Sequence, residues 1–328
     1  MENWKNNFSQ PIWDLGQTDS RLAGIYSTVR DTSTVEKFIH GQFLESAETY
    51  ARRYSGVDYF QSLIQESFNR IEWKSKILEN LKILDIGSGA GNSIIPLLRL
   101  CGQSEVIASD LSVPLLAILR KALIEKNLDS RCRVVQMNAE VLDFQSDSFD
   151  LVMGAAILHH LISPEKVIEG CARILKPGGV AVFYEPFELG NAMIKIIYRN
   201  LLEDPRSLTI RPGIRRFLKE MWQGLHLLKG KDKSAPIFQK LDDKWLFSRR
   251  YFEGLGEKFK FSDVLIYPIH GIDQMFETQV KTHLRLGCEV GPDRLPSWAW
   301  KKIKQFDDDF SLEQKEEMIL EGCVVFKK

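Results

Sequence analysis

The sequence predicts a doubly wound α/β fold, in which a mostly parallel sheet carries helices on both faces. Two observations support this fold class. Between residues 82 and 186, short apolar segments alternate with segments whose apolar residues recur at helical spacing, a pattern typical of parallel βαβ units. The first apolar segment also runs into a glycine-rich turn, and folds of this class bind ligands at such turns.

Five segments of this region have the composition of buried strands, and three segments between them have that of helices. The expected strands are Lys82–Ile86, Glu105–Ser109, Cys132–Met137, Phe149–Gly154 and Val180–Glu185. The expected helices are Asn92–Leu100, Val113–Glu125 and Glu165–Leu175. A helix that connects two strands of one sheet returns the chain to its starting edge, so these strands should run parallel.

The flanking regions differ from this core. Residues 1–80 are aromatic-rich without any strand-like run, and a helical N-terminal cap is expected there. Beyond the core the chain is mostly helical, except for Asp263–Ile269 and Gly322–Phe326, which should complete the sheet. The expected parts are the cap at 1–80, the core at 81–186, a helical lid insertion at 187–262, and remaining strands with a second helical insertion at 263–328.

The two insertions, 187–245 and 270–318, should roof the carboxyl edge of the sheet, where doubly wound folds bind ligands. The first contains two amphipathic stretches, Ile194–Leu202 and Phe217–Leu228. The turn Lys229–Ser234, rich in lysine, follows the second stretch and is expected to let this lid open and close.

Composition limits the compartment and the class of partner. Of 328 residues, 44% are hydrophobic and 27% charged, as in an ordinary globular protein, and the balanced net charge gives no argument for nucleic acid or an anionic membrane. No secretory signal or transmembrane segment is expected, so a cytoplasmic protein is predicted. The scattered cysteines (Cys101, Cys132, Cys171, Cys288 and Cys323) suit free thiols, and neither they nor the histidines are spaced as metal ligands.

The glycine-rich turn follows the first strand in the segment Leu81–Asn92. Gly87, Gly89 and Gly91 form a G-x-G-x-G pattern, in which a bare backbone lets a ligand approach the start of the next helix. A dinucleotide-binding turn would need its last glycine at position 92, which is Asn92. The spacing therefore argues against a dinucleotide.

Two acids beside this turn indicate a different nucleoside ligand. Asp85 lies on the strand immediately before the glycines, where a carboxylate suits a ligand that carries an ammonium group. Asp110 ends the second strand, where an acid can accept hydrogen bonds from both ribose hydroxyls. Asp110 could instead serve only as a helix cap, because aspartate is a favoured capping residue.

The run from Ile83 to Glu185 resembles the core of the class I S-adenosylmethionine-dependent methyltransferases, especially the small-molecule group. Its Asp-x-Gly-x-Gly-x-Gly turn (Asp85–Gly91) matches the family's first motif, and Asp110 stands at the place of the ribose-binding acid. Three further segments follow in the family's order: Asp147–Val152, Leu158–Leu161 and Leu175–Gly179. The resemblance covers about a third of the chain and implies a Rossmann-like seven-stranded sheet whose last strand, Gly322–Phe326, is antiparallel.

The resemblance also implies a set of cofactor-binding positions. Asn138-Ala139-Glu140 takes the place of the family's Asp-Ala-Glu stretch, where a side chain meets the adenine amino group and the next backbone N–H meets the ring. Glu140 could instead be a solvated loop acid. The positions expected to bind S-adenosyl-L-methionine are Asp85, Gly87, Ser88, Gly89, Gly91, Asp110, Leu111, Asn138, Ala139, Glu140 and Ala155.

Three titratable side chains are candidates for catalysis. His159, His160 and Glu185 stand at the ends of the fourth and fifth strands, which border the transferred methyl group in this fold. A neutral imidazole there can take a proton from a substrate hydroxyl; we expect His160 first, then His159, with Glu185 orienting the substrate or a histidine. The other reading is that these residues only fill the interface and the pocket wall. His40, His226, His270 and His283 are isolated.

The expected function is methyl transfer to a small, partly apolar metabolite, with O-methylation before C-methylation, in biosynthesis. Residues 195–260 contain 16 basic and 8 acidic residues, which leaves open a methyltransferase for tRNA or another macromolecule. The amphipathic spacing favours instead an insertion that packs its apolar side and solvates its basic side, so nucleic acid is not the expected partner. A non-catalytic cofactor-binding protein is the third alternative, and the sequence does not predict the oligomeric state.

Overall fold

The computed structural model describes residues 4–29, 47–53, 57–71, 80–228, 233, 235–239 and 241–328. The described residues form one sheet of nine strands in the order β1-β2-β5-β4-β3-β6-β7-β9-β8. The strands are β1 (Trp13–Asp14), β2 (Ile25–Ser27), β3 (Lys82–Ile86), β4 (Glu105–Asp110), β5 (Cys132–Gln136), β6 (Phe149–Ala155), β7 (Leu175–Pro186), β8 (Asp263–Pro268) and β9 (Glu321–Lys327).

Helices connect and cover these strands. The α-helices are α2 (Ala47–Arg53), α3 (Val57–Arg70), α4 (Ile94–Leu100), α5 (Val113–Glu125), α6 (Pro164–Ile174), α7 (Glu188–Glu203), α8 (Pro212–Leu227), α9 (Pro236–Gln239), α10 (Arg249–Phe259), α11 (Met275–Cys288), α12 (Ser297–Asp308) and α13 (Leu312–Glu317). The short 3₁₀ helices are η1 (Trp4–Asn7), η2 (Leu15–Gln17), η3 (Ser20–Leu22), η4 (Leu158–His160), η5 (Pro205–Thr209) and η6 (Pro292–Arg294).

The strand directions confirm the parallel core. Neighbouring strands from β2 to β7 all pair in parallel, whereas β9 pairs antiparallel with both β7 and β8. The five core strands form where the sequence predicted them, although β7 begins at Leu175 rather than Val180. The expected antiparallel strand Gly322–Phe326 is β9.

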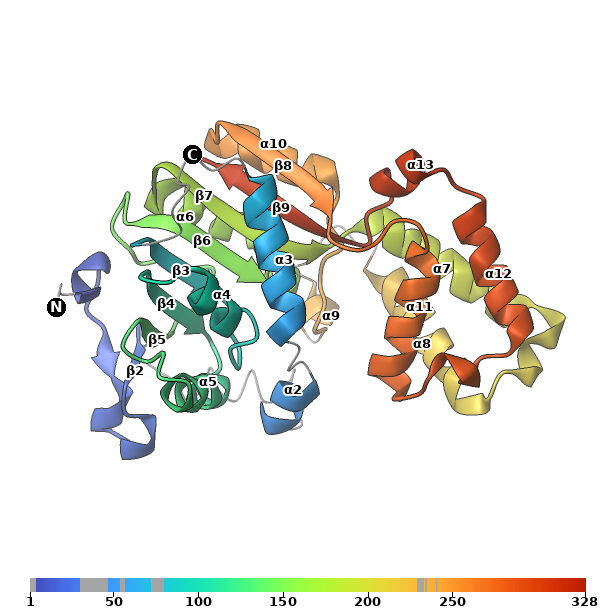
Figure 1. Ribbon diagram of the computed structural model, residues 1–328, viewed down its shortest axis with the longest axis horizontal. Coiled ribbons are helices and arrows are strands. Elements are labelled where there is room, and N and C mark those ends of the chain that lie inside the picture. Colours follow the sequence, from blue (N-terminus) through green and yellow to red (C-terminus); the bar gives the residue numbers. More distant parts are fainter. Residues whose placement is uncertain are drawn as a thin grey trace.

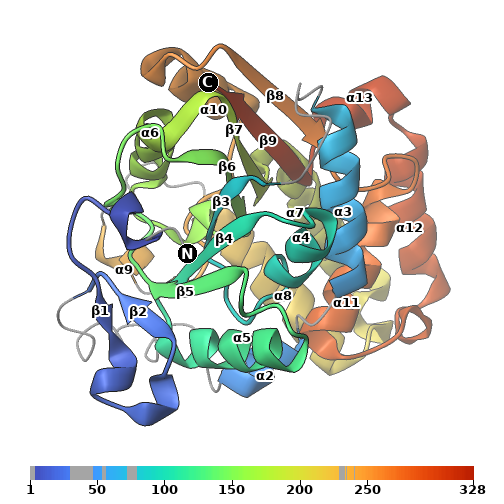
Figure 2. The ribbon, with the colours of Figure 1, turned by 60° about the vertical axis from the view of Figure 1, so that its left-hand side comes forward.

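The N-terminal region departs from the prediction of a purely helical cap and a seven-stranded sheet. β2 adds to the edge of the sheet beside β5, and β1 pairs with β2, so the sheet has two more strands than expected (Figure 2). Ile25 is buried there, and the Ser27 hydroxyl lies 2.8 Å from Oε1 of Gln136. Strands of two and three residues are too short to produce an alternating pattern, which is why the sequence did not reveal them.

Alternate residues of the strands face two apolar layers. Leu84, Val152 and Phe183 face a layer formed with α6 and α10, whereas Ile83, Leu151 and Val182 face a layer formed with α3, α4 and α5. Figure 2 shows α3 and α4 on one side of the strands and α6 on the other. Parallel strands covered on both faces read as continuous apolar runs, as these do.

The two insertions come together in one helical lobe, which we define as α7, α8, α11 and α12. The lobe has a hydrophobic core of its own, to which Tyr198, Leu218, Phe276 and Ile303 contribute. It lies beyond the sheet, and α7 leaves directly from the end of β7 (Figure 1). Segments widely separated in the sequence therefore share one apolar core, as their amphipathic spacing requires.

The remaining parts of the first insertion lie elsewhere. Helix α10 packs on the sheet face with α6 and β8, because Phe252 and Leu255 are buried in that layer. The turn at 229–234, the expected joint of the lid, lies outside the described residues except for Lys233. Within the described part of the chain, no helix combines the length and the apolar character needed to cross a membrane.

Candidate functional site

The glycine turn connects β3 to α4 with a backbone that side chains tolerate poorly. Gly87, Gly89 and Gly91 all have positive φ angles, of 70°, 52° and 103°. A Cβ atom on Gly87 would lie 2.8 Å from the Ile157 side chain, whereas one on Gly89 would meet no atom of the described residues within 4 Å. Packing thus requires glycine at position 87, whereas beside Gly89 no described residue blocks a ligand from approaching the backbone.

Asp85 lies near the end of β3, just before this turn, and one of its carboxylate oxygens is unsatisfied among the described residues. The residue is fully buried, and the Ser93 hydroxyl donates to its Oδ2 at 3.3 Å. Its other oxygen, Oδ1, is buried without a hydrogen-bond partner among the described residues. Burial raises the pKa of Asp85 to about 7. A buried acceptor of this kind suits a ligand that brings a donor, in particular an ammonium group.

Asp110 holds the glycine turn from the end of β4. Its Oδ2 accepts from the N–H of Gly89 at 2.9 Å, and its Oδ1 accepts from the N–H of Ser112 at 2.8 Å. The cap of α5 is Ser112, whose side chain accepts from Leu115, so Asp110 is not the helix cap. Burial raises the pKa of Asp110. Each carboxylate oxygen has a second lone pair with which it can accept from a ligand hydroxyl.

The segment after β5 is shaped by its own side chains. Asn138 is exposed, and its Oδ1 accepts from the N–H of Glu140 at 2.9 Å, while Ala139 is buried. Glu140 is not a solvated loop acid. Its Oε1 accepts from the N–H groups of Ile162 and Ser163 at 3.0 and 2.9 Å, and so fixes the loop that begins α6.

The histidine turn, residues 157–161, follows the end of β6 at Ala155. Glu185, fully buried at the end of β7, holds it. Oε1 of Glu185 accepts from the N–H groups of Ile157 and Leu158, at 3.0 and 2.7 Å. Its Oε2 accepts from the N–H of His159 at 3.2 Å and lies 2.6 Å from Nδ1 of that imidazole. This one carboxylate therefore sets both the backbone of the turn and the orientation of the His159 ring.

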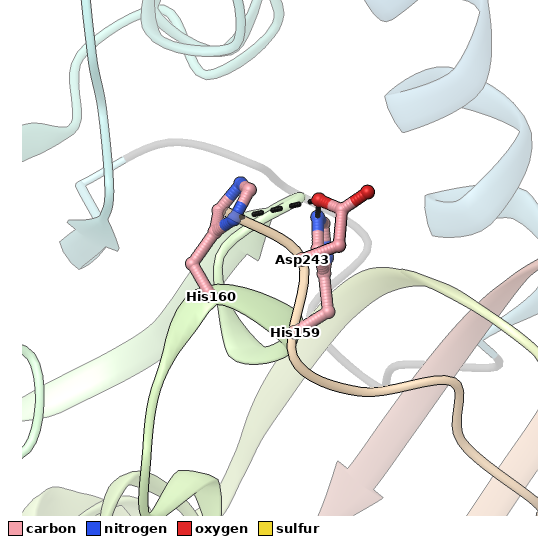
Figure 3. Close-up of side chains that lie close together, drawn as sticks. All are labelled: His159, His160 and Asp243. Carbon is pink, nitrogen blue, oxygen red and sulfur yellow. Dashed lines mark ion pairs between the residues drawn. The ribbon is translucent and has the colours of Figure 1, made fainter. Parts of the chain in front are cut away.

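A segment of the first insertion, residues 241–247, lies across the histidine turn and is called the strap. The N–H groups of Lys244 and Trp245 donate to the carbonyl of His159 at 2.8 and 3.2 Å. Oδ1 of Asp243 then lies 3.4 Å from Nε2 of His159 (Figure 3). Nδ1 of His160 lies 3.1 Å from the carbonyl oxygen of Asp242. Asp242 and Asp243 were not predicted as site residues, since nothing in the sequence connects this insertion with the fourth strand.

The two histidines differ in their electrostatic surroundings. Burial would lower the pKa of His159, but the charges and hydrogen bonds of Glu185 and Asp243 outweigh it and raise the pKa to about 10. His159 is therefore an imidazolium at neutral pH and has no vacant nitrogen for a further proton. In His160, Nδ1 faces a carbonyl and so carries the hydrogen, which makes Nε2 the proton acceptor of the neutral ring.

The remaining histidines lie apart from this turn. In the lobe, Nδ1 of His283 is 2.6 Å from the Tyr198 hydroxyl, and Nε2 of His270 accepts from the N–H of Leu320 at 3.1 Å. His40 lies outside the described residues. Within the described ranges, the only group of three potential metal ligands with close donor atoms is His159, His160 and Asp243. The sequence predicted no metal site, because these ligands come from separate segments.

A cavity of about 590 Å³ lies beside the strap, between it and the lobe. Phe187, Trp245 and Phe247 form an aromatic wall, and Leu225 and Leu228 of α8 and its C-terminal flank add apolar surface. Lys195, Lys233, Arg249, Arg250, Glu188 and Glu317 supply charged groups to the lining. The cavity therefore suits a molecule that is apolar over much of its surface and polar in part.

Comparisons with known proteins agree with this geometry. A family model described as a methyltransferase domain matches residues 84–183. A ubiquinone/menaquinone biosynthesis C-methyltransferase of Azotobacter vinelandii is 28% identical over 192 residues, covering 56% of this chain and 72% of that protein. A ubiquinone biosynthesis O-methyltransferase of Chelativorans is 30% identical over 201 residues, covering 58% of this chain and 76% of that protein. Other relatives are matched over 55–59% of their own length.

Solved structures also resemble this chain, and one of them is matched over most of its length. It is the complex between the Haloferax volcanii Trm112 methyltransferase activator and a methyltransferase, with a TM-score of 0.52 and 14% identity. The match covers 89% of this chain and 96% of the other. At this identity the likeness concerns the fold alone, and the fold it supports is the sheet that carries the glycine turn and the histidine turn.

Proposed function

Because this chain belongs to the class I S-adenosylmethionine-dependent methyltransferases, we propose that it methylates a hydroxyl group of a small, partly apolar metabolite in a biosynthetic pathway. The chain is an enzyme, and its cofactor is S-adenosyl-L-methionine. The observation that carries the proposal is the aromatic cavity beside the strap, which itself covers the histidine turn at the carboxyl edge of the sheet.

The residues around the glycine turn fit the cofactor. Oδ1 of Asp85, buried and without a hydrogen-bond partner among the described residues, suits its ammonium group, and the carboxylate of Asp110 suits its ribose hydroxyls. No described residue fills the space beside Gly89, which leaves room there for the ligand against the backbone. Asn138 and Ala139 would meet the adenine. Bound there, the cofactor supplies an activated methyl group, so the protein has to align the acceptor and exclude water.

The acceptor class follows from the cavity and from the relatives. An aromatic wall with a few charged groups favours an acceptor with a ring or chain and a polar end. The named relatives act in ubiquinone and menaquinone biosynthesis, one as a C-methyltransferase and one as an O-methyltransferase. We place O-methylation first because a hydroxyl must lose a proton, and His160 offers an acceptor for it.

The basic first insertion supports a second candidate, a methyltransferase for RNA. Arg199, Arg215, Arg216 and Lys219 line an open groove of about 530 Å³ with Trp222, on α7 and α8. Phosphate contacts make binding fall steeply as salt rises. Activity that stays constant between low and moderate salt supports the small-molecule acceptor, whereas a steep loss supports RNA.

Calorimetry tests the cofactor site. We expect S-adenosylmethionine and its demethylated product to bind, and NAD not to bind. Asp110→Ala should weaken binding by about 1–3 kcal/mol, because the ribose hydroxyls and the N–H group of Gly89 would lose their acceptor. Asp129→Ala is the control and should leave affinity unchanged. Asp129 lies between α5 and β5, at the end of α5 away from Asp110, and its side chain is partly exposed. Equal affinity of wild type and Asp110→Ala would remove the ribose role.

The same titration at several pH values tests Asp85. Its pKa of about 7 means that the carboxyl group of the free protein is largely protonated at pH 6 and ionised at pH 8. Only the ionised form attracts an ammonium group, so affinity for the demethylated cofactor should rise about tenfold from pH 6 to pH 8, since one pKa unit corresponds to about 1.4 kcal/mol. Asp85→Asn should bind more weakly and lose this dependence; an unchanged dependence would assign it to another group.

A further inference from the structure

Two histidines and an aspartate from distant segments converge above the ends of β6 and β7. Nε2 of His159 lies 3.4 Å from Oδ1 of Asp243, and Nδ1 of His160 lies 3.7 Å from the same oxygen. The three donor atoms all lie within 4.8 Å of one another, and Figure 3 shows both imidazoles directed at one carboxylate oxygen of Asp243. Around a four-coordinate Zn²⁺ with bonds of about 2.0–2.1 Å, neighbouring ligand atoms lie about 3.3 Å apart. Two of these separations are already close to that value.

The surroundings of His159 have a feature of metal-binding histidines. Its Nδ1 is 2.6 Å from Oε2 of the buried Glu185, which leaves Nε2 as the nitrogen directed at Asp243. A metal ion at Nε2 would displace the proton that this nitrogen carries in the imidazolium, so metal binding would release a proton. A carboxylate that holds the second ring nitrogen fixes the tautomer and makes the ligating nitrogen more basic. Glu185 is itself held by three backbone N–H groups, so His159 is oriented in advance.

The charges at this point favour a cation. The carboxylates of Glu185, Asp242 and Asp243 surround the two imidazoles, with the Asp242 carboxylate 3.1 Å from Nδ1 of His160. The ammonium group of Lys244 is turned to the carbonyl oxygens of Leu241 and Asp242. Imidazole nitrogens with one carboxylate suit zinc and neighbouring transition metals, whereas magnesium and calcium prefer oxygen ligands alone.

We infer that His159, His160 and Asp243 form a binding site for a divalent transition-metal ion of the zinc type, and that its occupancy stops proton transfer at His160. Metal binding at Nδ1 leaves the hydrogen of the neutral ring on Nε2, which then cannot accept another proton. The inhibitory consequence rests on the proposed function, whereas metal binding itself does not. Since the strap supplies Asp243 and the histidine turn supplies the other two ligands, the metal would also tie the strap to the turn.

Zn²⁺ binding measured in competition with a chromophoric chelator tests the site. We expect one Zn²⁺ per chain, and Co²⁺ should give the visible absorption of a four-coordinate ion. Asp243→Asn should weaken Zn²⁺ binding by more than the roughly 10–100-fold that loss of an outer-shell partner costs. The Asp243 side chain is 60% exposed, so this variant should fold.

Asp242→Asn is the matched control, because it removes the same charge from the neighbouring position without removing one of the three donor atoms. It should weaken Zn²⁺ binding by a clearly smaller factor. Absence of stoichiometric binding, or equal weakening in both variants, would overturn the site and leave an ion-pair network in its place.

Activity provides the second readout. Saturating Zn²⁺ should lower methyl transfer in the wild type, and a chelator should restore it. In Asp243→Asn, inhibition should require a Zn²⁺ concentration higher by the same factor as the loss of affinity. Activation by Zn²⁺ would overturn the inhibitory role. Failure to find any methyl acceptor would count against the proposed function, and the binding measurement would still decide the metal site.

Discussion

Replacing His160 by alanine is expected to lower kcat by about 10²–10⁴-fold, the usual contribution of a general base, while cofactor affinity stays nearly constant. The reason is that Nδ1 of His160 faces the carbonyl of Asp242, which makes Nε2 of the neutral ring the acceptor for a hydroxyl proton. The measurement is kcat with a methyl acceptor, together with calorimetry of the demethylated cofactor.

Three further variants locate the proton acceptor. His159→Ala should lower kcat by a smaller factor than His160→Ala does. The reason is that His159 is already an imidazolium between Glu185 and Asp243 at neutral pH and cannot accept the proton. Glu185→Gln tests the orientation of that ring. His226→Ala, which removes an exposed histidine from α8, is the control and should leave kcat unchanged. If the His159, His160 and Glu185 variants all keep kcat within about threefold of wild type, alignment alone accounts for catalysis.

Glu185→Ala is expected to lower the free energy of unfolding by about 3–5 kcal/mol, the usual cost of removing one partner of a buried ion pair. The residue is fully buried and accepts from the N–H groups of Ile157, Leu158 and His159 as well as from the His159 imidazole. Without it these donors and the imidazolium lose their acceptor. Urea unfolding of wild type and variant gives the difference.

Two variants control this measurement. Glu185→Gln keeps an oxygen acceptor of similar shape and should destabilise the protein less than alanine does. Glu188→Ala removes an exposed acid three positions further along the chain and should change the free energy of unfolding by no more than about 0.5 kcal/mol. Equal stability of wild type and Glu185→Ala would mean that the carboxylate does not hold the histidine turn.

Local patterns predicted the sheet core well. Strand β3 begins and ends where its apolar run predicts, and α5 coincides with Val113–Glu125. The acid–glycine turn was also predicted, since positive φ angles and a bare backbone require glycine at Gly87 and Gly91. These features depend on neighbouring residues and on burial on both faces of a sheet. Such burial produces continuous apolar runs in the strands and helical spacing in the helices, which can be recognised in the sequence.

Other features of the fold and the site produce no pattern that can be recognised in the sequence. β2 contains three residues and is held by pairing with β5, so it gives no alternation of its own. The role of Glu140 depends on the N–H groups of Ile162 and Ser163, which only the turn of the chain after β6 brings near. Likewise, the apolar faces of α7 and α11 predict that each is buried, but not that they share one core.

The sequence by itself determined the parallel core strands β3 to β7, the glycine turn and the acids Asp85 and Asp110, because these lie within one continuous run of alternating strands, turns and helices. Only the tertiary structure decided how the histidine turn is completed. Glu185 reaches it from the next strand, and the strap brings Asp242 and Asp243 to it from an insertion. Charges that meet across such distances in the chain interact through space, and their strength depends on separation and burial, which no local pattern encodes.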